Sequence, residues 1–395
     1  MRREQTTAER VLVLATLVLV AFGTVMVYSA TSGLASDPLF YLERNGAYAL
    51  AGVVGMWAMA RFDYRRLANA APMLVLISIG LLLVVFAAGV TAKGERRWLP
   101  LPGGFTLQPS ELAKVAICVF AAAVLAERRI APRDWREAMR PVGAATAVVC
   151  GLIVISDLGS AISVALGGMA VLVAAGAARG ALGRIALAGI AVIALSIAQK
   201  PYRGERLMAF LQPDASLQGA GYQIHQAQIA IGSGGLLGRG IGESVQKLGF
   251  LPEARTDMIL GIIGEELGAI GMLATFAAFA AVAWAGYAIA LRSTDRFGKL
   301  LAAGLTTLIC GQAVLNAGGV LGVLPLTGVP LPFISYGGTS LISLLLAIGL
   351  VLSVAANGRA AAARSLRVSA RVVDARPAPA PLPVRRARAA GSRRR

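Results

Sequence analysis

The chain has 395 residues, of which 57% are hydrophobic and only 15% are charged, and its mean hydropathy is +0.70. Soluble domains contain about 45–50% apolar and about 25% charged residues, so the composition excludes an ordinary soluble domain and predicts a membrane protein. The net charge is +18, but no segment offers the basic face of a folded soluble module, which excludes a nucleic-acid-binding protein.

Apolar stretches near the spanning length of about 20 residues predict an all-α polytopic membrane protein with ten transmembrane helices. The first stretch is too long for the apolar core of a cleaved signal peptide, so we expect it to be retained. The ten stretches fall at 10–30, 46–60, 69–90, 108–126, 142–156, 158–178, 183–199, 261–291, 299–323 and 338–356.

The lysines and arginines predict the orientation of these spans. An even number of spans places both termini on one side of the membrane. With the N-terminus inside, 27 of the 38 lysines and arginines lie in inside segments and 10 in outside segments. Cytoplasmic loops of membrane proteins carry such an excess of positive charge. Both termini are therefore expected in the cytoplasm, and the chain in the cytoplasmic (inner) membrane.

Two segments are longer than the other connections. Residues 200–260 form a predicted extracytoplasmic loop between spans 7 and 8, and a structured loop of this length is usually functional. Residues 357–395 are rich in Ala, Pro and Arg and are expected to be a disordered cytoplasmic tail near anionic headgroups. The domain layout is then an N-terminus of residues 1–9, a transmembrane domain of residues 10–356 and this tail.

Polar residues concentrate at the predicted outer face. In "QPSELAK", Glu111 and Lys114 are three residues apart and share one face of a helix. They either form an ion pair that lets both enter the membrane, or they line a substrate groove, since ionisable groups within membranes usually serve a site.

Three further polar residues at this face allow two interpretations each. Asp157 in "SDLGS" is either a turn cap or part of a site. Arg203 and Arg206 in "YRGERL" either bind a phosphate, whose oxygens match the guanidinium, or contact outer lipid headgroups.

The glycine-rich stretch "IGSGGLLGRGIGES" is not a nucleotide-binding loop, because no strand precedes it and no GK[ST] follows. Tight backbone turns that hold a loop against the membrane surface explain these glycines better. The proline- and glycine-rich residues 324–340 predict an irregular approach to the last span. The three cysteines have neither disulfide nor metal-ligand spacing, and the single histidine excludes a histidine-cluster metal site.

Residues 251–268, "LPEARTDMILGIIGEELG", place carboxylates where the chain enters the membrane. On a helix, Asp257 and Glu265 would share a face two turns apart, with Glu266 close to it. Clustering and burial raise carboxyl pKa values, so one of these groups could serve as a general base. A capped helix N-terminus is the alternative, and it explains Asp257 better than the two glutamates.

These motifs together resemble the SEDS family of bacterial membrane glycosyltransferases, the FtsW/RodA group. The resemblance is carried, in family order, by "GERRWL", "QPSELAK", "SDLGSA", "YQIHQAQIAIGSGGLLGRGIGESVQKLGFLPEARTDMILGIIGEELG" and "GVLPLTGVPLPFISYGGTSL", and it covers most of residues 10–356. The form "GRGIGESVQKLGFLPEA" is more similar to the FtsW division branch than to the elongation branch.

The resemblance implies a polymerase that joins lipid II units on the outer face of the bacterial cytoplasmic membrane, releases undecaprenyl pyrophosphate and acts in septal wall synthesis. It implies that Asp257, in the family's "TD" motif, is catalytic. Arg255 replaces the family's usual His and is expected to lower the pKa of that base. The expected substrate-binding residues are Arg96, Arg97, Glu111, Lys114, Arg203, Arg206, Gln226, Glu265, Glu266 and Ser335.

Pyrophosphate is a good leaving group, so the reaction needs a base and positive charge more than a strong acid. No cofactor is required by the sequence, and a divalent cation, Mg²⁺ or Mn²⁺, stays open. The expected partners are lipid II, a class B penicillin-binding protein, division or elongation proteins and membrane lipids. A lipid II flippase and a non-catalytic division scaffold are the alternative functions.

Overall fold

The computed structural model describes residues 2–33, 38–92, 95–127, 136, 139–212 and 219–374. The chain divides into two units, Met1–Gly358 and Arg359–Arg395. The cavity and the contacts described below lie in the first unit.

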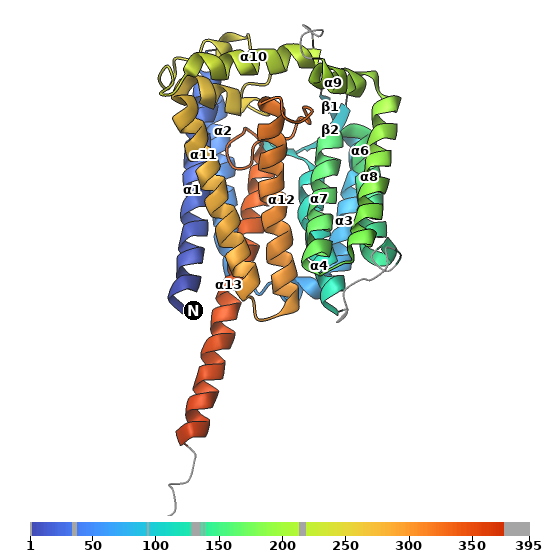
Figure 1. Ribbon diagram of the computed structural model, residues 1–395, viewed down its shortest axis with the longest axis vertical. Helices are drawn as coiled ribbons and strands as arrows, with labels where there is room; N and C mark the ends of the chain where they lie inside the picture. The colour runs from blue at the N-terminus through green and yellow to red at the C-terminus, as the bar shows by residue number, and fades with distance from the viewer. Residues whose placement is uncertain are drawn as a thin grey trace, which may run out of the picture. The chain divides into compact units, whose positions relative to one another are not determined.

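Long apolar helices make up most of the first unit (Figure 1), and each predicted span overlaps one of them. They are α1 (Arg2–Thr31), α2 (Pro38–Arg61), α3 (Arg66–Ala88), α4 (Pro109–Glu127), α6 (Ala144–Ser156), α7 (Leu158–Ala174), α8 (Arg179–Gln199), α11 (Ile259–Arg292), α12 (Arg296–Val320) and α13 (Gly338–Asp374). Seven helices in the described part of the chain are long and apolar enough to cross a membrane, whereas α6 and α7 are shorter apolar helices.

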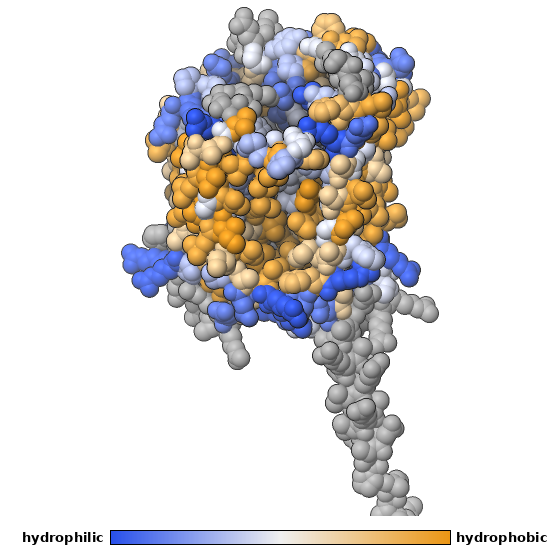
Figure 2. Space-filling model, turned by 180° about the vertical axis from the view of Figure 1, so that it is seen from behind, coloured by the Kyte–Doolittle hydropathy of each residue, from blue (hydrophilic) through white to orange (hydrophobic). Residues whose placement is uncertain are grey.

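A belt of apolar side chains surrounds the long helices. Figure 2 shows this belt in orange, with hydrophilic residues above and below it. Large side chains in the belt point outward, and Leu14, Leu50, Leu76, Leu187 and Leu291 are each more than 60% exposed. A monomeric soluble protein rarely exposes so large an apolar surface. The expectation of an all-α polytopic membrane protein is therefore confirmed.

Shorter elements gather at the end of the helices opposite the N-terminus of α1, which we call the outer end (Figure 1). Residues 200–260 contribute α9 (Pro201–Leu211), α10 (Gly219–Gly234) and the 3₁₀ turn η4 (Gln246–Leu248). Here α9 and α10 lie across the ends of the long helices. The predicted outer loop thus contains two helices of its own.

A small antiparallel sheet also lies at the outer end and was not predicted. It consists of β1 (Val90–Ala92), β2 (Glu95–Pro100) and β3 (Thr106–Leu107), in the order β1-β2-β3, with the 3₁₀ turn η1 (Pro102–Gly104) before β3. The strands are short and half of β2 is charged, so the sequence lacks the alternating apolar pattern by which strands are recognised.

Helix α11 is broken at Gly268, and a glycine loop fills the break. Gly268 has φ 65° and ψ −163°, so the hydrogen bonds from residues 269 and 270 to residues 265 and 266 are not made within the helix. The amides of Ala269 and Ile270 donate instead to the carbonyls of residues 235 and 236. The carbonyls of residues 265 and 266 accept from the amides of residues 239 and 240. The loop therefore replaces all four backbone partners.

Glycine is required on both sides of this junction, which we call the α11 splice (residues 234–240 with residues 264–270). A Cβ atom on Gly238, at φ 80°, would lie 2.2 Å from the carbonyl oxygen of Glu266. A Cβ atom on Gly268 would lie 2.4 Å from the amide nitrogen of Gly238. Only glycine permits such close approach of two backbones, which explains part of the "GSGGLLGRG" stretch.

The last helix extends into the segment that was predicted to be a disordered tail. Helix α13 ends at Asp374, and residues 375–395 lie outside the described residues. The residues after Gly358 are rich in Ala and Arg, which favour helix, and the first proline is Pro377. The N-terminal segment predicted as a separate piece is likewise helical, because α1 begins at Arg2.

Candidate active site

A cavity of about 1150 Å³ opens at the outer end, between β2, the N-terminal ends of α4 and α7, α9 and two irregular segments. One part of its wall is apolar and comes from α7 and α8, with Leu158, Ile162, Ile193 and Ile197. Further apolar lining comes from residues 324–326 and from Leu315, and the polar part of the wall includes Glu95, Arg97, Gln108, Glu111, Asp157, Tyr202, Arg203, Arg206, Gln223, Glu253, Arg255, Thr256, Asp257, Tyr336 and Ser340. The cavity can therefore hold a molecule that combines an apolar chain with charged and hydroxylated groups.

Asp257 lies in this wall and is fixed through its backbone. It precedes α11, in the turns that follow η4. The side-chain amide of Asn316 on α12 donates to the carbonyl of Asp257 at 2.7 Å and to the carbonyl of Val329 at 2.8 Å. The hydroxyl of Ser335 donates to the carbonyl of Thr256 at 2.5 Å. Two segments that are distant in sequence, α12 and the residues before α13, thus hold the aspartate in place.

The surroundings of Asp257 favour its protonated form. Burial raises the pKa of its carboxyl group, and the negative charge of Glu253 raises it further. The hydroxyl of Thr256 lies 2.9 Å from Asp257 Oδ1 and 2.8 Å from Glu253 Oε2, so the two carboxylates share one donor. A carboxylate with a raised pKa is a stronger base, which suits proton abstraction near neutral pH.

Other neighbours lower the pKa of Asp257, and the cation among them is Arg206, whereas the sequence predicted Arg255. The hydrogen bond from Thr256 and the charge of Arg206 both lower the pKa of Asp257. Arg206 belongs to α9, and a Cβ atom on Gly328 would lie within 3.5 Å of both its guanidinium and the Asp257 carboxylate. Arg255, expected to lower the pKa, places its guanidinium 4.6 Å from the ring centroid of Tyr41.

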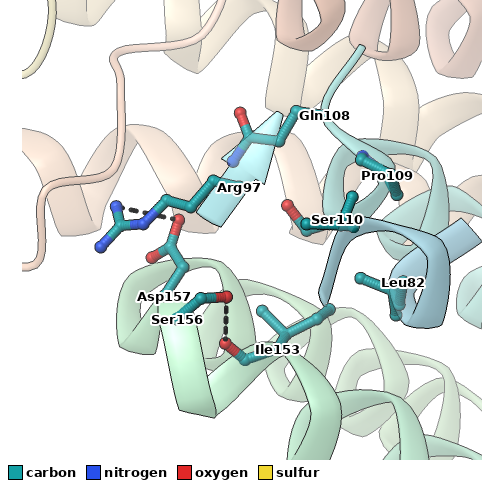
Figure 3. Close-up of a pocket in the computed structure, with 9 residues that line it drawn as sticks. Leu82, Arg97, Gln108, Pro109, Ser110, Ile153, Ser156 and Asp157 are labelled. Atoms are coloured by element: carbon teal, nitrogen blue, oxygen red, sulfur yellow. Dashed lines mark hydrogen bonds and ion pairs between the residues drawn. The ribbon is translucent and has the colours of Figure 1, made fainter. Parts of the chain in front are cut away.

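Arg97 faces the cavity from β2. Its guanidinium lies 3.7 Å from the carboxylate of Asp157, and Figure 3 shows the two side chains directed toward each other beside a small neighbouring pocket. Asp157 also accepts from the amide and hydroxyl of Ser160 at 3.0 and 2.9 Å, which makes it the N-cap of α7. The capping interpretation of Asp157 is confirmed, and its second oxygen also faces an arginine in the cavity.

The other predicted arginines differ in position. Neighbouring residues of a strand point to opposite faces, so Arg96 points away from the face of β2 that carries Arg97. Arg96 is exposed and donates to the carbonyl of Phe86. Arg203 is buried, and its guanidinium donates to Ser196 and to the carbonyl of Val154 at 2.7 Å. Arg96 therefore lies outside the cavity, and Arg203 lines it with most of its donors already used.

The predicted pair of Glu111 and Lys114 forms a buried ion pair, with 2.8 Å between the charged atoms and both side chains 1% exposed. Lys114 also donates to the side chain of Gln312 at 3.0 Å. Glu111 lines the cavity and Lys114 does not. Both interpretations of this pair thus hold in part: the two charges neutralise each other, and one of them forms cavity wall.

Glu265 and Glu266 do not line the cavity, and the idea that they share a helix face with Asp257 is wrong, because α11 begins only at Ile259. Glu265 accepts from the hydroxyl of Ser244 at 2.5 Å and from two backbone amides next to η4. Glu266 accepts from the hydroxyl of Ser29 on α1 at 2.7 Å and lies 3.4 Å from the ammonium group of Lys247. Both carboxylates anchor the outer loop.

Two more predicted residues lie beside the cavity instead of in it. Gln226 is on α10, where Gln223, one turn earlier, lines the cavity. Ser335 is buried and positions the segment that carries Asp257, while its neighbour Tyr336 lines the cavity. Burial raises the pKa of the Tyr336 hydroxyl. In the part of the chain that the structure describes, no three His, Cys, Asp or Glu side chains gather as they do around a metal ion.

A comparison with models of protein families shows to which family this chain belongs. Residues 9–360 match the family FtsW/RodA/SpoVE, described as "cell cycle protein". The chain belongs to this family. The match covers eight of the ten long helices completely, most of α1 and α13, and every element that lines the cavity.

Individual members of the family agree with this assignment. A probable peptidoglycan glycosyltransferase FtsW from Geobacter metallireducens is 41% identical over 354 residues, which are 87% of this chain and 93% of the relative. Stage V sporulation protein E from Bacillus subtilis is 36% identical over 370 residues, 91% of this chain and 100% of the relative.

Solved structures of the family share the fold. A chain from a peptidoglycan synthase complex, described as showing structural coordination of polymerization and crosslinking, has a TM-score of 0.70 at 30% identity, covering 88% of this chain and 97% of that chain. The rod shape-determining protein RodA from Thermus thermophilus has a TM-score of 0.66 at 28% identity, covering 88% of this chain and 96% of that chain.

Proposed function

We propose that this FtsW/RodA-family chain is a peptidoglycan glycosyltransferase that joins lipid II units on the outer face of the bacterial cytoplasmic membrane. One observation carries the proposal: Asp257, whose carboxyl pKa is raised, lines the same cavity as the cation Arg206. A base and a cation in one partly apolar cavity fit a lipid-linked sugar pyrophosphate. The name of the Geobacter relative supports glycosyl transfer, and the family's description as a cell cycle protein supports a role in cell division.

In the proposed reaction, Asp257 accepts the proton of the attacking sugar hydroxyl. The hydroxyl oxygen forms a bond to the anomeric carbon of the second sugar, whose bond to the pyrophosphate oxygen breaks. Undecaprenyl pyrophosphate then leaves with the bonding electrons, and Arg206 and Arg97 stabilise its charge. The apolar wall from α7 and α8 accommodates the first part of the lipid chain.

We further propose that the chain acts with a transpeptidase. The similar peptidoglycan synthase complex coordinates polymerization with crosslinking, which supports such a pairing. Polymerisation and crosslinking are chemically separate, and no element of this chain is assigned to crosslinking. The class B penicillin-binding protein expected from the sequence is the partner to test.

The test measures glycan strands made from purified lipid II in the presence of this partner. Asp257→Asn keeps the shape of the side chain and removes the base, so we expect no strands. Glu243→Gln, on an exposed part of the same loop, is the matched control and should polymerise as the wild type does. Equal strand synthesis by Asp257→Asn would eliminate Asp257 as the base. No strands from the wild type would favour a flippase or a scaffold.

The same assay tests the role of a divalent cation. Strand synthesis is measured after chelation and again after Mg²⁺ or Mn²⁺ is restored. We expect the arginines to supply part of the positive charge with or without the cation. If activity persists in chelator, the arginines alone stabilise the charge of the leaving pyrophosphate.

A further inference from the structure

The loop of the α11 splice carries two exposed leucines that the proposed reaction does not use. Leu236 is 74% exposed and Leu237 is 80% exposed. Fully burying a leucine is worth about 1.5–3 kcal/mol, so two adjacent leucines in water are unfavourable. The loop is also held rigidly by its four backbone hydrogen bonds to α11, so the leucines cannot fold back into the protein.

The position of the leucines along α11 places them at the membrane boundary. The carbonyl of Leu236 accepts from the amide of Ile270, about 16 Å along the helix from its first residue at 1.5 Å per residue. Residues 259–266, before the break, are buried in the protein. After the break, Ile270 and Leu273 are 56% and 65% exposed and belong to the apolar belt.

The length of α11 after the break agrees with this position. Residues 269–292 extend for about 36 Å, and a span needs about 30 Å. The bilayer therefore begins near Gly268, and the two exposed leucines lie beside the exposed Ile270, whose amide donates to the carbonyl of Leu236. Next to them, the side chain of Arg239 is 42% exposed and lies 3.5 Å from Glu265.

We propose that Leu236 and Leu237 insert into the outer leaflet of the bilayer, with the guanidinium of Arg239 at the phosphate level. The occupant of this surface is phospholipid, because the leucines lie beside a lipid-facing helix surface and the neighbouring charge is complementary to a phosphate. Amphipathic side chains commonly hold apolar groups in lipid and a cation at the headgroups. This anchor would fix the depth of the outer loop relative to the membrane and does not depend on the proposed reaction.

Spin-label accessibility tests the anchor. The three native cysteines are replaced by alanine, and a spin label is attached at Leu237→Cys in phospholipid nanodiscs. Collision rates with lipid-soluble oxygen and with a water-soluble nickel complex are then compared with two controls. Leu273→Cys reports a lipid-facing position of α11, and Glu243→Cys reports an exposed polar position of the same loop.

We expect the label at position 237 to resemble the label at position 273, with frequent oxygen collisions and rare nickel collisions. A label that collides with nickel as often as the one at position 243 would overturn the proposal. A label shielded from both reagents would also overturn it, because protein would then cover the leucines.

A second measurement uses the unaltered chain. Nanodiscs are doped with a phospholipid that carries a photoreactive group near the headgroup end of its acyl chain, and adducts are mapped by mass spectrometry. Adducts on the peptide with residues 236 and 237 are expected. Their absence, with adducts present on the peptide with Leu273, would overturn the proposal independently of any substitution.

Discussion

The α11 splice makes a quantitative prediction about two glycines of one loop. Gly238 and Gly242 both have positive φ values, 80° and 90°. An alanine in this backbone conformation would be strained, and at either position it would destabilise the loop by about 1–2 kcal/mol. A Cβ atom at position 238 would also lie 2.2 Å from the carbonyl oxygen of Glu266, whereas one at position 242 meets nothing within 4 Å. The pair therefore separates backbone strain from loss of the junction.

The additional effect at position 238 follows from the hydrogen bonds that would be lost. Four backbone bonds join the loop to α11, and each contributes about 1 kcal/mol net. Gly238→Ala should therefore weaken the junction by up to about 4 kcal/mol more than Gly242→Ala, which corresponds to an exchange rate about 1000-fold faster.

Hydrogen exchange measured by mass spectrometry in nanodiscs checks this prediction. The readout is the exchange of the amides of Arg239, Gly240, Ala269 and Ile270, which form the junction. We expect fast exchange at all four in Gly238→Ala and near wild-type exchange in Gly242→Ala. Equal effects of the two substitutions would refute the junction and leave only the strain of a positive φ.

Four further substitutions test the cavity and the residues around it. Glu253→Gln removes a charge that raises the pKa of Asp257, so the acid limb of the pH–rate profile should move to lower pH; an unchanged limb contradicts this coupling. Arg206→Ala should raise the KM for lipid II by about 10- to 100-fold, the effect of one charged hydrogen bond. Arg96→Ala, outside the cavity, should change it less than twofold, and equal effects would argue against Arg206 as a phosphate ligand. Lys114→Met leaves a buried carboxylate unpaired and should destabilise the protein by about 3–5 kcal/mol, measured by detergent thermal unfolding.

The membrane helices were predictable from the sequence because lipid imposes a simple condition. A span must be long, apolar and helical, and each predicted stretch overlaps a helix of the structure. The small sheet was missed because its strands are short and partly charged, and they are paired by tertiary contacts. The helical part of the C-terminal segment was missed because the prolines that indicate disorder occur only from Pro377 onward.

The candidate site was predictable in part. Asp257, Arg97, Arg206 and Glu111, all selected from the sequence as ionisable residues of the predicted outer face, line one cavity, and their part in substrate binding stays a prediction. Glu265 was misassigned because its hydrogen-bond partners lie about 20 residues earlier in the chain.

Two further residues show why the sequence was insufficient. Arg96 and Arg97 are equivalent in the sequence and are separated only by the alternation of a strand that was not predicted. Glu253 lies within residues 251–268, whose carboxylates were noted in the sequence. Its link to Asp257 through the hydroxyl of Thr256 depends on a turn in which Glu253 itself has φ 58°.

The contact between Ser29 and Glu266 joins residues 237 positions apart in the chain. Ser29 belongs to α1 and is therefore synthesised well before Glu266, which belongs to the eighth of the ten long helices in chain order. During synthesis the outer part of α1 therefore stays without this partner until most of the chain has been inserted. The buried carboxylate then reaches its place together with Lys247 and the outer loop. Assembly of the outer end is accordingly a late step of biogenesis. In a chain truncated before α11, the outer part of α1 would lack its partner and would be accessible to the quality-control proteases of the membrane.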